Sequence, residues 1–209
     1  MAVITSITQQ RRGNRRSVFI DGDFAFGCNV NVVARFRLRE GMAIDDTLRR
    51  EIELGEVKQE AFDHALRLVG QRRQSERELR TKLGRKEYGP AVIDAVFDDL
   101  QRLGYLDDVK YAEVRAGDSV RLKKHGPQRA RSELIAKGID ADTAEQAVAA
   151  VYENVDELAM ATELAKKKTP SLRRLEPEVA RRRLIGFLQR RGFDFDTVRR
   201  AVESTLGSE

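Results

Sequence analysis

The sequence of 209 residues has one cysteine, two histidines and no tryptophan, and only 6% of its residues are aromatic. The single cysteine, Cys28, excludes an internal disulfide framework, and together with His64 and His125 it gives too few ligands for a structural zinc site. No apolar run approaches the roughly 18 residues that a membrane-spanning helix needs, and the first residues lack the layout of a secretory signal. We therefore expect a soluble cytoplasmic protein that does not contact membranes.

Charged residues, by contrast, make up 35% of the chain, with a formal net charge of +5. Residues 121–137 carry six basic side chains against the single acid Glu133, and residues 164–191 carry ten against Glu176 and Glu178. Such clusters can bind the phosphate groups of a nucleic acid, although a solvated helix face gives the same pattern. Because aromatic residues for base stacking are few, any contact with DNA is expected to be mainly to phosphates.

Residues 1–55 are rich in β-branched and aromatic residues and contain turn signals, which predict a small antiparallel sheet of about three strands and a short helix. The strongest signal is the Asp-Gly-Asp sequence at residues 21–23, since Asp-Gly tolerates the positive φ of a tight hairpin. We expect Phe19, Phe24 and Phe26 to form the core of this sheet.

From about Val57 onward the apolar residues recur with the 3.6-residue period of helices. Residues 75–78 and 142–145 both fit a capping box at the start of a helix. In this motif the side chains of the first and fourth residues each accept a hydrogen bond from the backbone N–H of the other residue. Prolines suit the first position of a helix, where the missing N–H costs nothing, and three are placed to do so. They are Pro90, Pro127 and Pro177.

The helical region also repeats itself. Residues 134–148 align without gaps on residues 188–202, and a weaker copy covers residues 83–96. Gly138 and Gly192 coincide in this alignment, and each fits a helix C-terminus, where glycine adopts the left-handed conformation freely. Each repeat has room for one longer helix followed by a helix–turn–helix pair, and units of this kind stack on their neighbours.

The sequence thus predicts a mainly α fold, an elongated array of three tandem three-helix repeats preceded by a small antiparallel β-rich N-terminal extension. The expected boundaries are residues 1–55 for the extension and residues 56–106, 107–153 and 154–209 for the three repeats.

The patterns in the sequence that could form a catalytic or metal site are weak. The glycine spacing of residues 22–27 is that of a phosphate loop, but Cys28 and Asn29 stand where lysine and Ser/Thr are needed. Pairs of acids recur and raise the possibility of a metal-dependent nuclease, yet two pairs precede helices, where aspartate caps backbone donors. The pairs are Asp98 with Asp99, Asp107 with Asp108, Asp140 with Asp142, and Asp194 with Asp196. We expect no enzyme activity, metal or cofactor.

Three segments of the chain resemble the RecX family of recombinase regulators. They are residues 73–83 (RQSERELRTKL), 103–112 (LGYLDDVKYA) and 124–139 (KHGPQRARSELIAKGI). The similarity covers residues 56–206, and the β-rich start of the chain resembles the extension of longer family members.

This resemblance implies a monomeric, non-enzymatic regulator of homologous recombination, DNA repair and the SOS response. Family members bind the filament of RecA on single-stranded DNA, depress its ATPase and strand exchange, and favour filament shortening. The implied partners are the RecA filament and single-stranded DNA, with double-stranded DNA as a further candidate through phosphate contacts. The basic positions that we carry as candidate filament or DNA contacts are Arg121, Lys123, Lys124, Arg129, Arg131, Lys166, Lys167, Lys168, Arg181, Arg182, Arg190 and Arg191. A general nucleic-acid-binding helical module that sequesters DNA stays open as the alternative.

Overall fold

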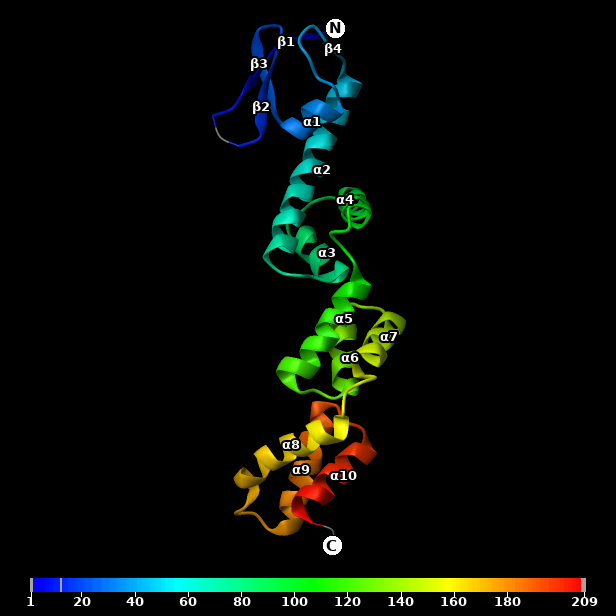
Figure 1. Ribbon diagram of the computed structural model, residues 1–209. Helices are drawn as coiled ribbons and strands as arrows, with labels where there is room; N and C mark the ends of the chain where they lie inside the picture. Colours follow the sequence, from blue (N-terminus) through cyan, green and yellow to red (C-terminus); the bar gives the residue numbers. More distant parts are fainter. Residues whose placement is uncertain (1, 12, 208–209) are drawn as a thin grey trace. The chain divides into compact units, whose positions relative to one another are not determined.

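The computed structural model describes residues 2–11 and 13–207 and divides into two compact units (Figure 1). The first unit contains Met1–Arg73 and Leu79–Leu106, and the second contains Gln74–Glu78 and Asp107–Glu209. Helices dominate both units, and an antiparallel sheet opens the chain. The predicted fold class, mainly α with three-helix repeats and a β-rich N-terminal extension, is confirmed.

The N-terminal sheet has four strands in the order β3-β2-β1-β4, one more than expected. The bounds are Ala2–Gln9 for β1, Arg15–Ile20 for β2, Asp23–Asn29 for β3 and Ala43–Ile44 for β4. The additional strand is too short for a periodic pattern and pairs with the outer edge of β1. Between β2 and β3, Asp21 and Gly22 have φ of 50° and 96°, which confirms the tight hairpin.

The core of the extension differs from expectation at Phe24, which is 60% exposed, and at Phe19, which is not part of the buried cluster, whereas Phe26 packs against it. Val18 pairs with Phe26 and Phe19 with Phe24, so the register shifts between them and leaves Ala25 as an additional residue in β3. A bulge of this kind turns the following side chains, so Phe24 meets the ring edge of Phe19 instead of the core.

Helix α2 (Asp46–Gln71) begins earlier than the periodicity indicated and runs through residue 55, where the extension was expected to end. The Asp45 side chain caps it by accepting a hydrogen bond from the Leu48 N–H at 2.7 Å. Ile52 of α2 belongs to the buried cluster of the sheet, whereas Ala61 and Ala65 belong to that of the first repeat. The other helices of this part are α1 (Val30–Arg35), α3 (Glu76–Gly84) and α4 (Pro90–Arg102).

The second unit contains two complete three-helix repeats. The second repeat consists of α5 (Asp108–Asp118), the π-helical turn η1 (Ser119–Lys123), α6 (Pro127–Ala136) and α7 (Ala141–Tyr152). The third consists of α8 (Glu157–Lys168), the 3-10 turn η2 (Thr169–Leu172), α9 (Pro177–Arg191) and α10 (Phe195–Leu206). The helices α4, α6 and α9 begin at the three prolines, as predicted.

One of the two predicted capping boxes is confirmed and the other is wrong. Ser75 Oγ accepts from the Glu78 N–H at 3.2 Å, and Glu78 Oε2 accepts from the Ser75 N–H at 3.4 Å. At the start of α7 the cap is Asp140, whose Oδ1 accepts from the Thr143 N–H at 2.9 Å, while Asp142 already lies in the first turn. Aspartate is therefore used here as a cap, as the acid pairs were interpreted.

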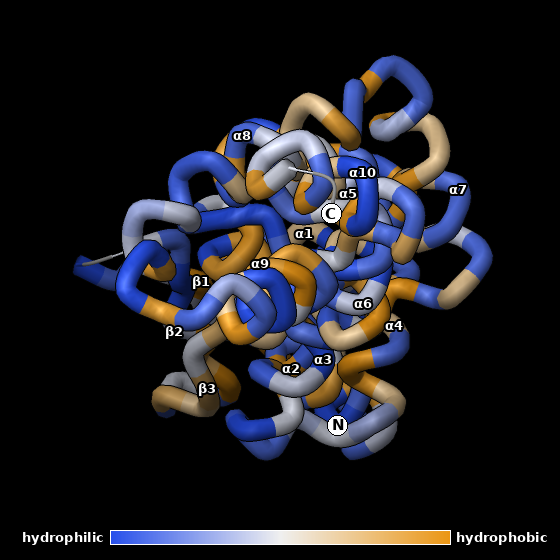
Figure 2. Tube along the Cα trace, turned by 90° about the horizontal axis from the view of Figure 1, so that it is seen from below, coloured by the Kyte–Doolittle hydropathy of each residue, from blue (hydrophilic) through white to orange (hydrophobic). Residues whose placement is uncertain are grey.

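The repeats of the second unit each bury their own cluster of small and aliphatic side chains, and Met160 packs against both clusters. Figure 2 shows hydrophilic and hydrophobic stretches alternating along the helices, as expected when one face of each helix is buried. Leu134 and Leu188, which coincide in the sequence repeat, are 2% and 0% exposed. The alignment of the repeats therefore places equivalent residues in equivalent core positions.

Truncating a core side chain of a repeat should lower the free energy of unfolding, and truncating an exposed neighbour should lower it less. We expect Leu134→Ala to lower the free energy of unfolding by about 2–5 kcal/mol, because it removes buried methyl groups and leaves a cavity. The neighbouring Ile135→Ala is the matched control, since Ile135 is 40% exposed and should cost less than half as much. Urea unfolding of both variants measures the difference, and equal losses would contradict the assigned core.

Candidate partner-binding surface

The basic stretch after α5 lies on an unusual backbone. The turn Ser119–Lys123 is a π-helix, a form that occurs mainly as short insertions, and Lys124 ends it with a left-handed φ of 51°. Arg121 and Leu122 project from this turn, with the Arg121 side chain 70% exposed and Leu122 78% exposed. The π turn therefore presents basic and apolar side chains together to solvent.

Several candidate cations are paired with carboxylates and are not free charges. Lys123 Nζ lies 2.6 Å from Glu133 Oε2, and Arg129 Nε lies 3.3 Å from Oε1 of the same residue. Lys124 pairs with Glu163 of α8, whose other oxygen lies 2.7 Å from Lys167 Nζ. The surface around η1 is therefore a mosaic of both signs, and its net positive charge is smaller than the sequence indicated.

The second and third repeats are joined by hydrogen bonds that involve backbone atoms. The Gly126 N–H donates to the Arg191 carbonyl at 2.8 Å, and the Gln128 N–H donates to the Gly192 carbonyl at 3.2 Å. Arg191 Nη1 in turn donates to the Lys123 carbonyl at 2.7 Å. Each of these bonds joins the end of α9 to the segment around the start of α6, so the two repeats are held in one fixed arrangement.

Gly192 is the residue that makes this approach possible. It ends α9 with a φ of 89°, and a Cβ placed on it would lie 2.3 Å from both the N and the Cβ of Arg129. No side chain fits at that distance. The predicted role of Gly192 as a helix C-cap is confirmed, and the close contact adds a second requirement for glycine that the sequence did not reveal.

Within the second unit, the Gln74–Glu78 segment makes a related contact with the second repeat. Ser75 Oγ donates to the Lys137 carbonyl at 2.6 Å, and Gly138, with a φ of 91°, lies against the side chain of Arg77. Glu78 accepts from Lys137 Nζ at 2.7 Å, with Tyr111 on its other oxygen at 3.2 Å.

Burial alone would raise the pKa of Glu78, but the bonds from Lys137, the Ser75 N–H and Tyr111 outweigh it and lower that pKa. The N–H of Glu76 donates to Asp108 Oδ1 at 3.0 Å and completes the contact. The Ser75–Glu78 segment therefore contacts the second repeat in addition to capping a helix.

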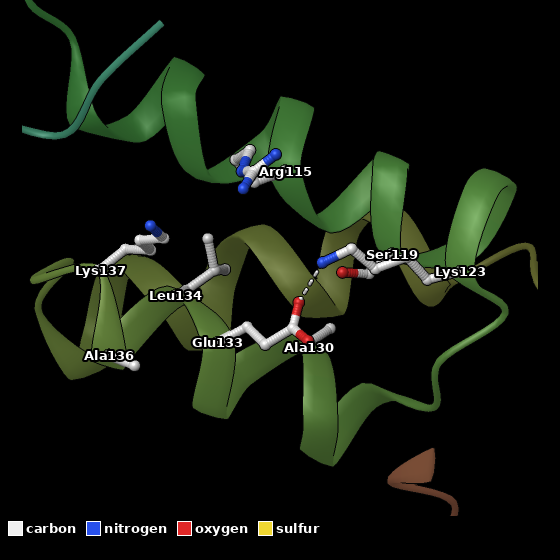
Figure 3. Close-up of a pocket in the computed structure, with 8 residues that line it drawn as sticks. All are labelled: Arg115, Ser119, Lys123, Ala130, Glu133, Leu134, Ala136 and Lys137. Carbon is white, nitrogen blue, oxygen red and sulfur yellow. Dashed lines mark hydrogen bonds and ion pairs between the residues drawn. The ribbon is translucent and has the colours of Figure 1, made fainter.

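A cavity of about 280 Å³ lies between α5 and α6 beside the π turn (Figure 3). Figure 3 shows Glu133 reaching from α6 towards Lys123, while Arg115 and Lys137 lie towards the other end. Burial favours the neutral form of Glu133, yet the hydrogen bond and charge of Lys123 lower the pKa of this carboxyl. His125 Nδ1 lies 3.3 Å from Glu133 Oε1, and burial lowers the pKa of His125, which favours the neutral ring.

Arg131, Arg181 and Arg182 do not form one surface with these residues. Arg131 pairs with Glu145 of α7 at 2.6 Å, away from the contact between the repeats. Arg181 and Arg182 lie in the first turns of α9, about 13 Å along the helix from Arg190 and Arg191 at its end. Among the cations at the end of α8, Lys168 lies 5.9 Å from the Phe187 ring, which Arg191 also approaches, at 5.5 Å. Lys166 is exposed on the same last turn.

Three side chains of this surface were missed by the sequence analysis. Glu163, which links Lys124 to Lys167, lies in another repeat, so no local pattern indicates it. Gln128 and Gln189, which line a groove between α6 and α9, are neutral and were overlooked in a search for charge. Within residues 2–11 and 13–207, no cluster of three or more metal-ligating side chains occurs, and no helix is long and apolar enough to cross a membrane.

Comparison with family models decides the relationship. Four models match in succession: "Regulatory protein RecX N-terminal domain" at residues 2–45, then the first, second and third three-helix domains of RecX at residues 61–107, 107–148 and 155–202. The chain belongs to the RecX family. Its β-rich extension and its three helical repeats are thus the RecX domains in their usual order.

Curated RecX relatives align over nearly the whole chain. "Regulatory protein RecX" of Bacillus velezensis is 32% identical over 98% of this chain and 78% of that protein, and that of Bacillus subtilis is 30% identical over 97% and 77%. The RecX of Chlorobium phaeobacteroides is 35% identical over 71% of this chain and 95% of its own length.

Two solved RecX structures share the fold. One crystal structure of regulatory protein RecX matches with a TM-score of 0.86 at 22% identity and full coverage of both chains. The RecX of Lactobacillus salivarius matches with a TM-score of 0.65 at 19% identity, over 72% of this chain and 97% of the other.

The contact at Gly192 of this RecX chain can be tested with a matched pair of glycines. Gly192→Ala and Gly207→Ala both place alanine at a φ of 89°, but only Gly192 has atoms within 4 Å of the new Cβ. We expect Gly192→Ala to cost about 1–3 kcal/mol more than Gly207→Ala, because Arg129 and its backbone must move. Thermal and urea unfolding measure this difference, and equal losses would show that the repeats do not meet here.

The ion pair at Glu133 should appear in the pH dependence of stability. Its pKa is lowered in the folded chain, so its contribution is present above its usual pKa of 4.5 and is lost as the pH falls through the lowered value. Glu133→Gln should therefore cost about 1 kcal/mol at pH 7 and progressively less in acid. Urea unfolding from pH 7 to pH 3 tests this, and a loss that is independent of pH would refute it.

Proposed function

We propose that this RecX-family chain is a negative regulator of homologous recombination and DNA repair. In this proposal it binds the filament of RecA on single-stranded DNA, inhibits RecA ATPase and strand exchange, and favours filament shortening. The observation that carries the proposal is the ordered series of four RecX domain matches along the chain. A match across every domain is a stronger guide to function than any one motif in the sequence.

The mosaic of charge around η1 supports a protein partner at this surface. Glu133 and Glu163 lie among Lys123, Lys124 and Lys167, and such carboxylates would repel a phosphate backbone laid across them. A protein surface that also carries both signs can pair with such a mosaic, which favours specific docking over general adhesion. Leu122, exposed in the same turn, adds an apolar contact suited to a protein.

In this proposal the chain acts by binding alone, as a monomer in the cytoplasm, without a cofactor or membrane contact. Its RecX relatives from Bacillus are named regulatory proteins. The paired acids that suggested a nuclease include Asp107, Asp140 and Asp194, each of which accepts a backbone N–H at the start of a helix. These aspartates already have a structural role.

The test is a titration of the chain into preassembled RecA filaments, reading ATP hydrolysis and filament length together. We expect hydrolysis to fall and filaments to shorten at amounts of the chain too small to cover the DNA. Unchanged hydrolysis and length at saturating amounts would refute the proposal.

The alternative is a general nucleic-acid-binding module that removes DNA from the recombinase. It predicts that inhibition disappears in proportion to the excess single-stranded DNA supplied after filaments form. An inhibition that persists in excess DNA favours the filament regulator, so a single series of DNA concentrations separates the two functions.

A further inference from the structure

A second concave feature lies where the third repeat meets the second, on the groove between the first turns of α6 and the last turn of α9. It has a volume of about 320 Å³ and is lined by Gln128, Arg129, Ser132, Gln189, Arg190 and Gly192. Unlike the cavity beside Glu133, it has no carboxylate among the described residues that line it. Two arginines and two glutamines thus line one space.

The two arginines have donors to spare. Arg129 donates to Glu133 through Nε alone, and no hydrogen bond from its terminal nitrogens is found in residues 2–11 and 13–207. Arg190 has no ion pair within those residues, and its Nη1 lies over Gly186, 3.2 Å from where a Cβ would stand. The exposed side-chain amides of Gln128 and Gln189 are likewise without a hydrogen bond there, whereas Ser132 already donates to the Gln128 carbonyl at 2.8 Å.

The groove is held open by the contact between the repeats. The Gln128 N–H donates to the Gly192 carbonyl, and Gly192 lies directly against Arg129, so both walls are fixed by the backbone. Binding an anion here therefore requires little rearrangement, which favours affinity.

The chemistry of this groove is particular to one pair of repeats. In the gapless alignment of the repeats at an offset of 54, Gln189 and Arg190 correspond to Ile135 and Ala136. The second repeat thus ends its middle helix with apolar side chains, where the third repeat offers an amide and a guanidinium. Because the fold is the same in both, the stacking of the repeats does not require these polar residues.

We propose that this groove binds one phosphate group of single-stranded nucleic acid, held between Arg129 and Arg190 with Gln128 and Gln189 as neutral donors. Guanidinium groups match phosphate oxygens with paired hydrogen bonds, and a tetrahedral phosphate accepts donors from several directions at once. A carboxylate presents its two oxygens in one plane, whereas the oxygens of a phosphate point in several directions towards the donors around this space. The proposal deepens the proposed function, since the filament contains single-stranded DNA, but it concerns the chain's own affinity for that DNA.

The test measures binding of a fluorescent oligo(dT) to the full chain by anisotropy over a series of salt concentrations. The variants are Arg190→Gln and Arg129→Gln. The matched control is Arg174→Gln, an exposed arginine before α9, from which the helix of 15 residues extends about 22 Å to the groove. Thermal unfolding of each variant verifies that the fold is intact.

We expect Arg190→Gln to weaken binding about 3- to 10-fold near 0.1 M salt and to reduce the slope of log K against log salt by roughly 0.7, the value for one phosphate contact on a single strand. Arg174→Gln should leave the slope unchanged. Equal slopes for Arg190→Gln and the wild-type chain would overturn the proposal.

Two further outcomes identify a different ligand. If Arg190→Gln binds oligo(dT) normally but loses affinity for RecA in the absence of DNA, the groove takes a protein carboxylate and the proposal fails. If inorganic phosphate raises the melting temperature of the wild-type chain but not of Arg190→Gln, at constant ionic strength and with oligo(dT) binding unchanged, the groove takes free anions only. A chain that does not bind oligo(dT) but still inhibits RecA would overturn this inference and leave the proposed function standing.

Discussion

The close approach of Gly192 to the first turn of α6 is the contact on which the rest of the second unit depends. It fixes the third repeat against the second through backbone hydrogen bonds, which exposed side chains alone could not do. The position of Arg191 beneath the π turn follows from it, as does the shape of the groove that contains Arg129 and Arg190. One left-handed glycine thus determines both the stacking of the repeats and the form of the surface at their contact.

Basic side chains around η1 are held in ion pairs and do not form a region of one charge. Lys123, Lys124 and Arg129 all lie within ion-pairing distance of a carboxylate, and a paired exposed charge contributes little to stability. What pairing provides is orientation, since each long side chain is held towards a defined neighbour. The two kinds of surface, the mosaic around η1 and the carboxylate-free groove beside Gly192, are suited to different partners although they lie close together in the sequence.

The sequence predicts the architecture well because its signals are local. Proline at the first position of three helices, the capping box at Ser75 and the hairpin at Gly22 each depend on a few neighbouring residues. The predictions that are wrong concern residues whose structure depends on a contact with a distant part of the sequence. Phe24 leaves the core because of a register shift against β2, and α2 starts early because Asp45 caps a segment whose apolar face packs on the sheet.

The same distinction holds for the binding surface. A count of basic residues finds the candidate arginines and lysines, but it cannot find Glu163, which approaches Lys124 only in the folded chain. Nor does the count distinguish Arg190, without an ion pair in the described residues, from Arg131, which is paired with Glu145. Long-range proximity is a product of stacking, so the sequence supplies the set of candidates and the fold selects among them.

The contact of the Gln74–Glu78 segment with the second repeat and the contact between the second and third repeats use different donors. At the first, the N–H of Glu76 donates to Asp108, whereas the corresponding first residue of α6 is Pro127, which has no N–H to donate. Gly126 supplies the donor there instead, and its partner is a carbonyl of the following repeat. The start of α6 is therefore matched to the end of α9 through backbone donors, whereas the start of α3 uses the Ser75 hydroxyl and the Glu76 N–H.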